Sequence, residues 1–82
     1  MGKHAKLAAR LKARPRDFTF QELTALMEGL GYKLNQRGSG SRVRFEHAGH
    51  PPVLMHKPHP SPVLKPYLIK MILEMLTDEG LI

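Results

Sequence analysis

Four histidines lie within thirteen residues of the chain: His47, His50, His56 and His59. Imidazole is the side chain that most readily both accepts and donates a proton near neutral pH. Shortly before them the sequence RGSGSRVRF passes from a glycine-serine stretch into alternating arginines and apolar residues. Guanidinium groups bind phosphate through forked hydrogen bonds. The two segments together predict either a phosphate-binding surface or the active site of a small RNA-cleaving enzyme.

RNA cleavage without a metal requires a base for the ribose 2′-hydroxyl, an acid for the leaving 5′-oxygen and cations around the transition state. Histidines and arginines meet all three requirements. Such a site acts on RNA alone, because DNA has no 2′-hydroxyl. We expect neither a metal nor another cofactor: the chain has no cysteine, the histidine spacings match no helical metal-binding pair, and Glu46 is the only carboxylate near them.

The second pair of histidines has the more suggestive surroundings. His56 and His59 flank Lys57 in the segment HKPHPSPVLKP, which has four prolines in eleven residues and is therefore expected to be a stiff, extended loop. We expect the charged side chains there to face the same groove as Arg42 and Arg44.

The first pair lies between two predicted strands. His47 and His50 are interpreted as solvated polar residues of an exposed turn, which is the commoner situation for polar side chains in connecting segments.

The elements that must position these residues follow from local patterns. Between residues 32 and 57, short segments with turn residues between them predict three antiparallel strands, at 32–36, 41–47 and 53–57. In the middle strand the two-residue period places Val43 and Phe45 on one face and Arg42 and Arg44 on the other. One face should pack on helices and the other should carry charge.

A helix is predicted to begin at Phe20. Thr19 and Glu22 have the spacing of a capping box, and Phe18 and Leu23 that of a hydrophobic staple. The apolar residues that follow have core-facing helical spacing, and two glycines are expected to end the helix; these residues are Leu23, Leu26, Met27 and Leu30, with Gly29 and Gly31.

Two further helices are predicted at the ends of the sequence. The last begins near Pro66, carries an apolar stripe and ends at Gly80. The first, at residues 3–14, is basic, with Leu7 and Leu11 on one face. We interpret it as a solvated extension that docks through its two leucines, and not as a dedicated nucleic-acid arm.

The 82 residues suffice for one α+β domain, with residues 1–15 as a basic helical extension and 18–80 as the core. Thirteen Lys and Arg against seven Asp and Glu give a net charge of +6, for which nucleic acid is the usual partner, although the charge alone fits a merely soluble basic protein equally well. The longest apolar run in the last quarter is three residues, and the basic start lacks the apolar centre of a secretory signal. We expect a cytoplasmic protein that does not associate with membranes.

The ordered segments of the chain resemble one known family. The order helix, three strands, helix, together with GSRVRF, VLMHKPHP and LKPY, resembles the HicA toxins of bacterial type II toxin-antitoxin pairs over roughly residues 19 to 76. The resemblance implies a double-stranded-RNA-binding-domain-like α-β-β-β-α fold with an extra N-terminal helix. It also implies an mRNA interferase that stops translation and a HicB-type antitoxin that covers the active site. We expect no DNA binding by this chain alone.

The chain departs from the family at one position. The family's usual Gly-Ser-His signature carries the catalytic histidine at the start of the second strand, where this chain has Arg42. Arginine cannot act as a base, because its pKa stays above about 12, but it can bind phosphate. Either proton transfer has moved to His56 or His59, the latter matching a histidine often found after the family's third strand, or this branch binds RNA and cuts poorly. We favour the relocation.

The sequence therefore predicts a catalytic set and an RNA-binding set. The catalytic set consists of His59, His56 and Arg42. The RNA-binding set consists of Arg37, Ser41, Arg42, Arg44, Lys57 and Lys65. The alternatives are a non-catalytic RNA-binding module and an interaction protein whose basic face meets an acidic partner.

Overall fold

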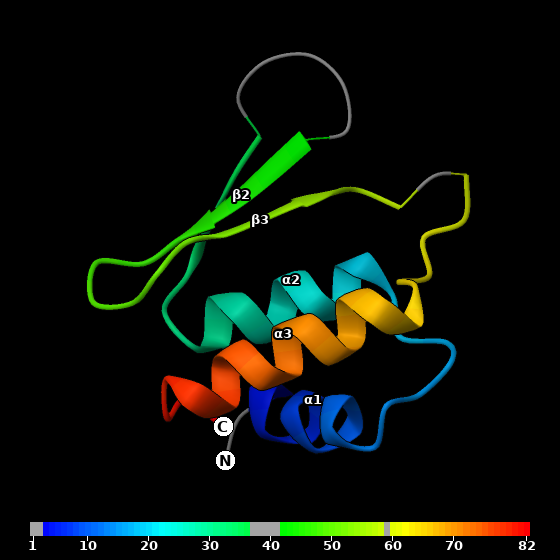
Figure 1. Cartoon of the computed structure of the whole chain (residues 1–82), viewed down its shortest axis with the longest axis horizontal. Helices are drawn as coiled ribbons and strands as arrows, with labels where there is room; N and C mark the ends of the chain where they lie inside the picture. Colours follow the sequence, from blue (N-terminus) through cyan, green and yellow to red (C-terminus); the bar gives the residue numbers. More distant parts are fainter. Residues whose placement is uncertain (1–2, 37–41, 59) are drawn as a thin grey trace.

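Three helices and a three-stranded antiparallel sheet make up the fold (Figure 1). The computed structural model describes residues 3–36, 42–58 and 60–82. The elements in chain order are α1 (Lys3–Lys12), α2 (Phe20–Gly29), β1 (Lys33–Asn35), β2 (Arg42–Glu46), β3 (Val53–His56) and α3 (Pro66–Asp78). The predicted α+β class and the predicted order of elements are confirmed.

The start of α2 follows the capping pattern in the sequence. The Thr19 hydroxyl accepts a hydrogen bond from the Glu22 N–H at 3.1 Å, and the Glu22 carboxylate accepts one from the Thr19 N–H at 3.0 Å. These bonds pair N–H groups that have no partner within the helix. At the other end Gly31 has φ +97°, a conformation that favours glycine, and the Tyr32 N–H donates to the Met27 carbonyl at 2.9 Å. The chain turns there into β1.

The extension α1 packs on α2 and α3, on the side away from the sheet (Figure 1). Leu11 is fully buried and Leu7 packs against the core, so the predicted docking through two leucines is confirmed. Gly29 permits the close approach of α1, because a Cβ atom there would lie 2.8 Å from Cγ of His4. This role of Gly29 comes in addition to its predicted place at the end of α2.

An ion-pair network also holds α1 against α2. Arg10 lies 2.8 Å from a carboxylate oxygen of both Glu22 and Asp17. Its guanidinium holds the pKa of Glu22 below the ordinary value, assisted by the hydrogen bonds from Thr19. Arg10 therefore links the extension to the capping box of α2.

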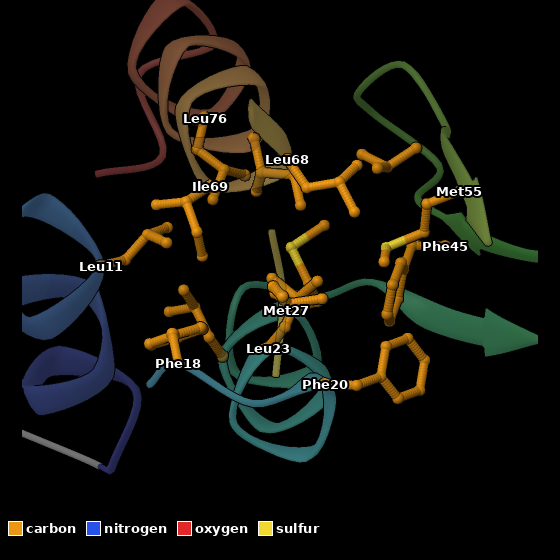
Figure 2. Packing of buried hydrophobic residues seen from close by; sticks show 14 of the residues in the cluster. Leu11, Phe18, Phe20, Leu23, Met27, Phe45, Met55, Leu68, Ile69 and Leu76 are labelled. Carbon is orange, nitrogen blue, oxygen red and sulfur yellow. The ribbon is translucent and has the colours of Figure 1, made fainter. Parts of the chain in front are cut away.

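The core lies between the sheet and the helices. Figure 2 shows Phe45 and Met55 of the sheet, Leu68 and Ile69 of α3, and Leu11 of α1 converging on it. In β2 the residues alternate between exposed and buried, as the sequence predicted. The face of the sheet away from the core is therefore left to the arginines.

Candidate nucleic-acid interface

The segment with the arginines and the segment with His56 meet on the outer face of the sheet. β2 and β3 are antiparallel, with Arg42 opposite His56 and Arg44 opposite Leu54. Directly opposed residues in a sheet point to the same face. Because all four residues are exposed, the expectation that His56 faces the same side as Arg42 and Arg44 is confirmed.

The outer face is hollowed along β2. A concavity of about 310 Å³ is lined by Asn35, Arg42, Val43, Arg44, Glu46 and Leu54. Arg44 Nε lies 3.1 Å from Glu46 Oε2, and both side chains are about half exposed. Such an exposed ion pair contributes little to stability, so a phosphate can compete for the guanidinium. Within the described residues Arg42 has no ion-pair partner.

A second concavity contains His56, the strand partner of Arg42. It measures about 340 Å³, lies between the end of β3 and the start of α3, and brings His56, Lys57 and Lys65 together. Lys65 is the exposed residue immediately before α3. Three of the predicted site residues thus border one hollow, and the strand pairing places Arg42 beside it.

The prediction that Lys57 faces the groove of Arg42 and Arg44 is wrong. The alternation of β3 continues one residue past the strand, so Lys57 follows the buried residues Val53 and Met55 to the helix side. Its Nζ lies 5.7 Å from the centroid of the Phe20 ring and donates to Gln36 Oε1 at 3.3 Å. There it lines a concavity of about 440 Å³ between α2 and the sheet.

The interpretation of His47 as a solvated turn residue is wrong, because its side chain holds the turn in place. Its Nδ1 accepts a hydrogen bond from the Gly49 N–H at 2.9 Å, which leaves the proton on Nε2, 3.2 Å from the Leu30 carbonyl. The ring packs edge-on against Tyr32, whose own pKa is raised by burial. His47 thus attaches the turn between β2 and β3 to the end of α2.

His50 is likewise held in place. Its Nδ1 lies 2.8 Å from Glu79 Oε1 at the end of α3, with both side chains mostly buried, and its ring packs edge-on against His47. Tyr32 donates a hydrogen bond to the carbonyl of Pro51 at 3.0 Å. The interpretation of His50 as a solvated turn residue is therefore also wrong.

Three predicted site residues, Arg37, Ser41 and His59, lie outside the described residues. Sequence reasoning also missed two exposed apolar side chains close to the site, Leu54 at 57 % and Tyr67 at 65 % exposure. The exposure of Leu54 could have been predicted, because strand alternation puts it on the opposite face from Val53 and Met55. Tyr67 lines the hollow that contains His56.

Two classes of feature are absent from the described ranges. Across residues 3–36, 42–58 and 60–82 no group of three His, Asp or Glu side chains is arranged to bind a metal ion. In the same part of the chain no helix has the length and apolar character needed to cross a membrane.

Comparison with known proteins assigns the chain to a family. Searches of the curated proteins and of the solved structures find no significant match. Among models of protein families, the one described as HicA toxin of bacterial toxin-antitoxin matches residues 20–76, from the start of α2 to near the end of α3. That match covers well over half of the 82 residues, so the chain belongs to the HicA toxin family of bacterial toxin-antitoxin systems.

Proposed function

We propose that this toxin is a metal-independent endoribonuclease that cleaves mRNA and thereby stops translation. The observation that carries the proposal is the pairing of Arg42 with His56 on the exposed face of the sheet, beside a hollow that Lys65 also borders. A cation for the phosphate and a group able to transfer a proton are then neighbours, as the cleavage of RNA requires.

In this proposal Arg42 and Arg44 bind the scissile and neighbouring phosphates, while Lys65 and Arg37 draw the RNA into place. An imidazole removes the proton of the ribose 2′-hydroxyl, whose oxygen attacks the phosphorus. The bond to the 5′-oxygen breaks, and a protonated group supplies the proton of the new 5′-hydroxyl, leaving a 2′,3′-cyclic phosphate. His56 takes one of these roles and His59 the other.

A second candidate function is favoured by one observation. Arg42 occupies the position at which the family usually has its catalytic histidine, and a guanidinium does not exchange protons in the neutral range. The same surface without proton transfer would be an RNA-binding module, with salt-sensitive affinity and no cleavage products.

The proposed partner is a HicB-type antitoxin that covers the basic face. A net charge of +6 and exposed arginines on one side of the sheet suit an acidic partner surface. The proposal further includes a cytoplasmic location, a fold like that of double-stranded-RNA-binding domains, and no DNA binding by this chain alone.

The direct test is to incubate the purified protein with RNA, with and without EDTA, and to follow the products on denaturing gels. We expect cleavage that EDTA leaves unchanged and that His56→Ala and His59→Ala each reduce strongly. The matched chemical control is the same RNA with 2′-O-methyl groups, which should bind and stay intact. Intact RNA at a large excess of protein would refute the nuclease and leave the RNA-binding module.

A further inference from the structure

Tyr67 is the most exposed large apolar side chain among the described residues. It is the second residue of α3 and lines the hollow that contains His56 and Lys65. It also lines another concavity, of about 400 Å³, on its other side. An aromatic ring that stands between two hollows on a basic protein has no role in the core and presents a face to solvent.

The second concavity is basic. It is lined by Arg14, Pro15, Arg16, Pro66, Tyr67, Ile69 and Lys70, so the linker between α1 and α2 forms one wall and the start of α3 the other. Figure 1 shows this linker and the start of α3 at the same end of the helices. Arg14 has φ +52°, a left-handed conformation that is uncommon for a residue with a side chain. The chain nevertheless has arginine there, where glycine would be unstrained.

The cations of this concavity are not neutralised by their neighbours. The linker's one carboxylate, Asp17, is paired with Arg10 at 2.8 Å. In the part of the chain that the structure describes, Arg14, Arg16 and Lys70 take part in no ion pair. Three cations gathered around one hollow without a counter-charge favour a polyanionic ligand.

We propose that this concavity is a second RNA subsite, in which an unpaired base stacks on Tyr67 while Arg14, Arg16 and Lys70 bind adjacent phosphates. The subsite rests on the proposed RNA-cleaving function, because one strand would pass from Arg42 and His56 over Tyr67 to the linker. Arg14 and Arg16 precede the region that matches the HicA family. The N-terminal extension therefore lengthens the RNA-binding surface of this chain.

Single-stranded RNA suits this arrangement better than an acidic protein segment. Every base offers a flat face for stacking on an aromatic ring, and a strand carries its phosphates at regular intervals beside the bases. An acidic peptide would pair with the cations but would leave the ring of Tyr67 exposed. The ring and the cations together therefore select for a nucleotide chain.

The chain offers a direct optical probe of the stacking. It has no tryptophan and only two tyrosines, of which Tyr32 is buried and Tyr67 is exposed. Titration with an uncleavable 2′-O-methyl oligonucleotide of about 12 nucleotides, within the range that single-strand-binding surfaces span, should quench the tyrosine emission. Tyr67→Phe should bind equally well, by fluorescence anisotropy of a labelled oligonucleotide, but show no quenching.

Substitutions then separate the base from the phosphate contacts. Tyr67→Ala should weaken binding by roughly 5- to 100-fold, the range found for the loss of one stacked base. Arg16→Gln with Lys70→Gln should reduce the slope of log affinity against log salt by about 0.7 for each cation removed. The matched control is Lys6→Gln, an exposed cation of α1 that lines neither hollow and should leave the slope unchanged.

Two results of the binding experiments would overturn the subsite. One is a Tyr67→Ala affinity within twofold of the parent together with an unchanged salt slope in the Arg16 and Lys70 variant. The other is Tyr67-dependent binding of an acidic peptide of equal charge but not of the oligonucleotide. If RNA is cleaved with a KM that Tyr67→Ala leaves unaltered, the subsite fails and the nuclease stands. If the oligonucleotide binds through Tyr67 but no RNA is ever cut, the nuclease fails and the subsite stands.

Discussion

Arg42 and His56 are direct partners across the antiparallel pair of β2 and β3, on the face of the sheet away from the core. The Cβ atoms of such opposed residues lie about 5 Å apart. The guanidinium and the imidazole therefore extend from neighbouring positions on the same face of the sheet. In the proposed nuclease His56, which follows Arg42 by fourteen residues, would supply the imidazole at this position.

Substitution of Arg42 should reduce cleavage without affecting the fold, because its side chain is exposed. We expect Arg42→Ala to lower kcat/KM by roughly 100-fold, which is typical for the loss of a group that stabilises transition-state charge. Arg42→Lys should retain part of the activity, since it keeps the charge but not the forked geometry. Lys33→Ala, an exposed cation at the far end of the same face, is the control. Full activity of the Arg42→Ala enzyme would exclude a catalytic role for Arg42.

The elements were predictable because their signals are local. The capping box of α2 spans residues 19–22, and the alternation of β2 is complete within five residues. Both patterns fix which side chains face the core without reference to the rest of the chain. The outward direction of Arg42 and Arg44 was predicted for this reason.

The errors concern contacts between distant residues. His47 contacts a carbonyl 17 residues away, and His50 contacts a carboxylate 29 residues away. Nothing in the sequence near either histidine indicates these partners, so both were interpreted as solvated. Lys57 was misplaced because all charged side chains at the end of the third strand were expected on the face of Arg42 and Arg44. The alternation of the predicted strand 53–57 puts Lys57 on the side of Val53 and Met55 instead.

Gly31 should tolerate no side chain. Its φ of +97° disfavours a Cβ atom, and a Cβ there would lie 2.8 Å from Nε2 of His47. We expect Gly31→Ala to lower the free energy of unfolding by about 1–3 kcal/mol, measured by urea denaturation. Gly49→Ala is the matched control, because its Cβ would meet the same ring at 3.7 Å, an ordinary contact. Equal stability of the two variants would contradict this account of the α2 to β1 turn.

The link between the extension and α2 should depend on pH. The pKa of Glu22 is lowered from its ordinary value of 4.5, chiefly by the hydrogen bond from Arg10. A carboxylate whose pKa is lower in the folded than in the unfolded state stabilises the fold at pH values above its unfolded-state pKa. This stabilisation is lost as the pH falls through its folded-state pKa. We expect Glu22→Gln to cost about 1 kcal/mol at neutral pH and almost nothing in strong acid.

Denaturation of the parent and of the Glu22→Gln protein across this pH range measures that difference directly. Glu28→Gln is the control, because Glu28 is an exposed carboxylate of the same helix without an ion pair among the described residues. A Glu22→Gln penalty that stays constant from neutral pH to strong acid would show that the charge of Glu22 does not matter.

The contact between His50 and Glu79 should contribute to the stability of the fold. Nδ1 of His50 and Oε1 of Glu79 are 2.8 Å apart, and the pair is ionic only when the histidine is protonated. A double-mutant cycle of His50→Gln and Glu79→Gln, measured by urea denaturation, should give a coupling free energy of about 1 kcal/mol. The same cycle with Glu74 in place of Glu79 is the control, since Glu74 is an exposed carboxylate of the same helix outside the ion pairs among the described residues. A coupling free energy as small as that of the Glu74 control would mean that this contact does not attach the β2 to β3 turn to α3.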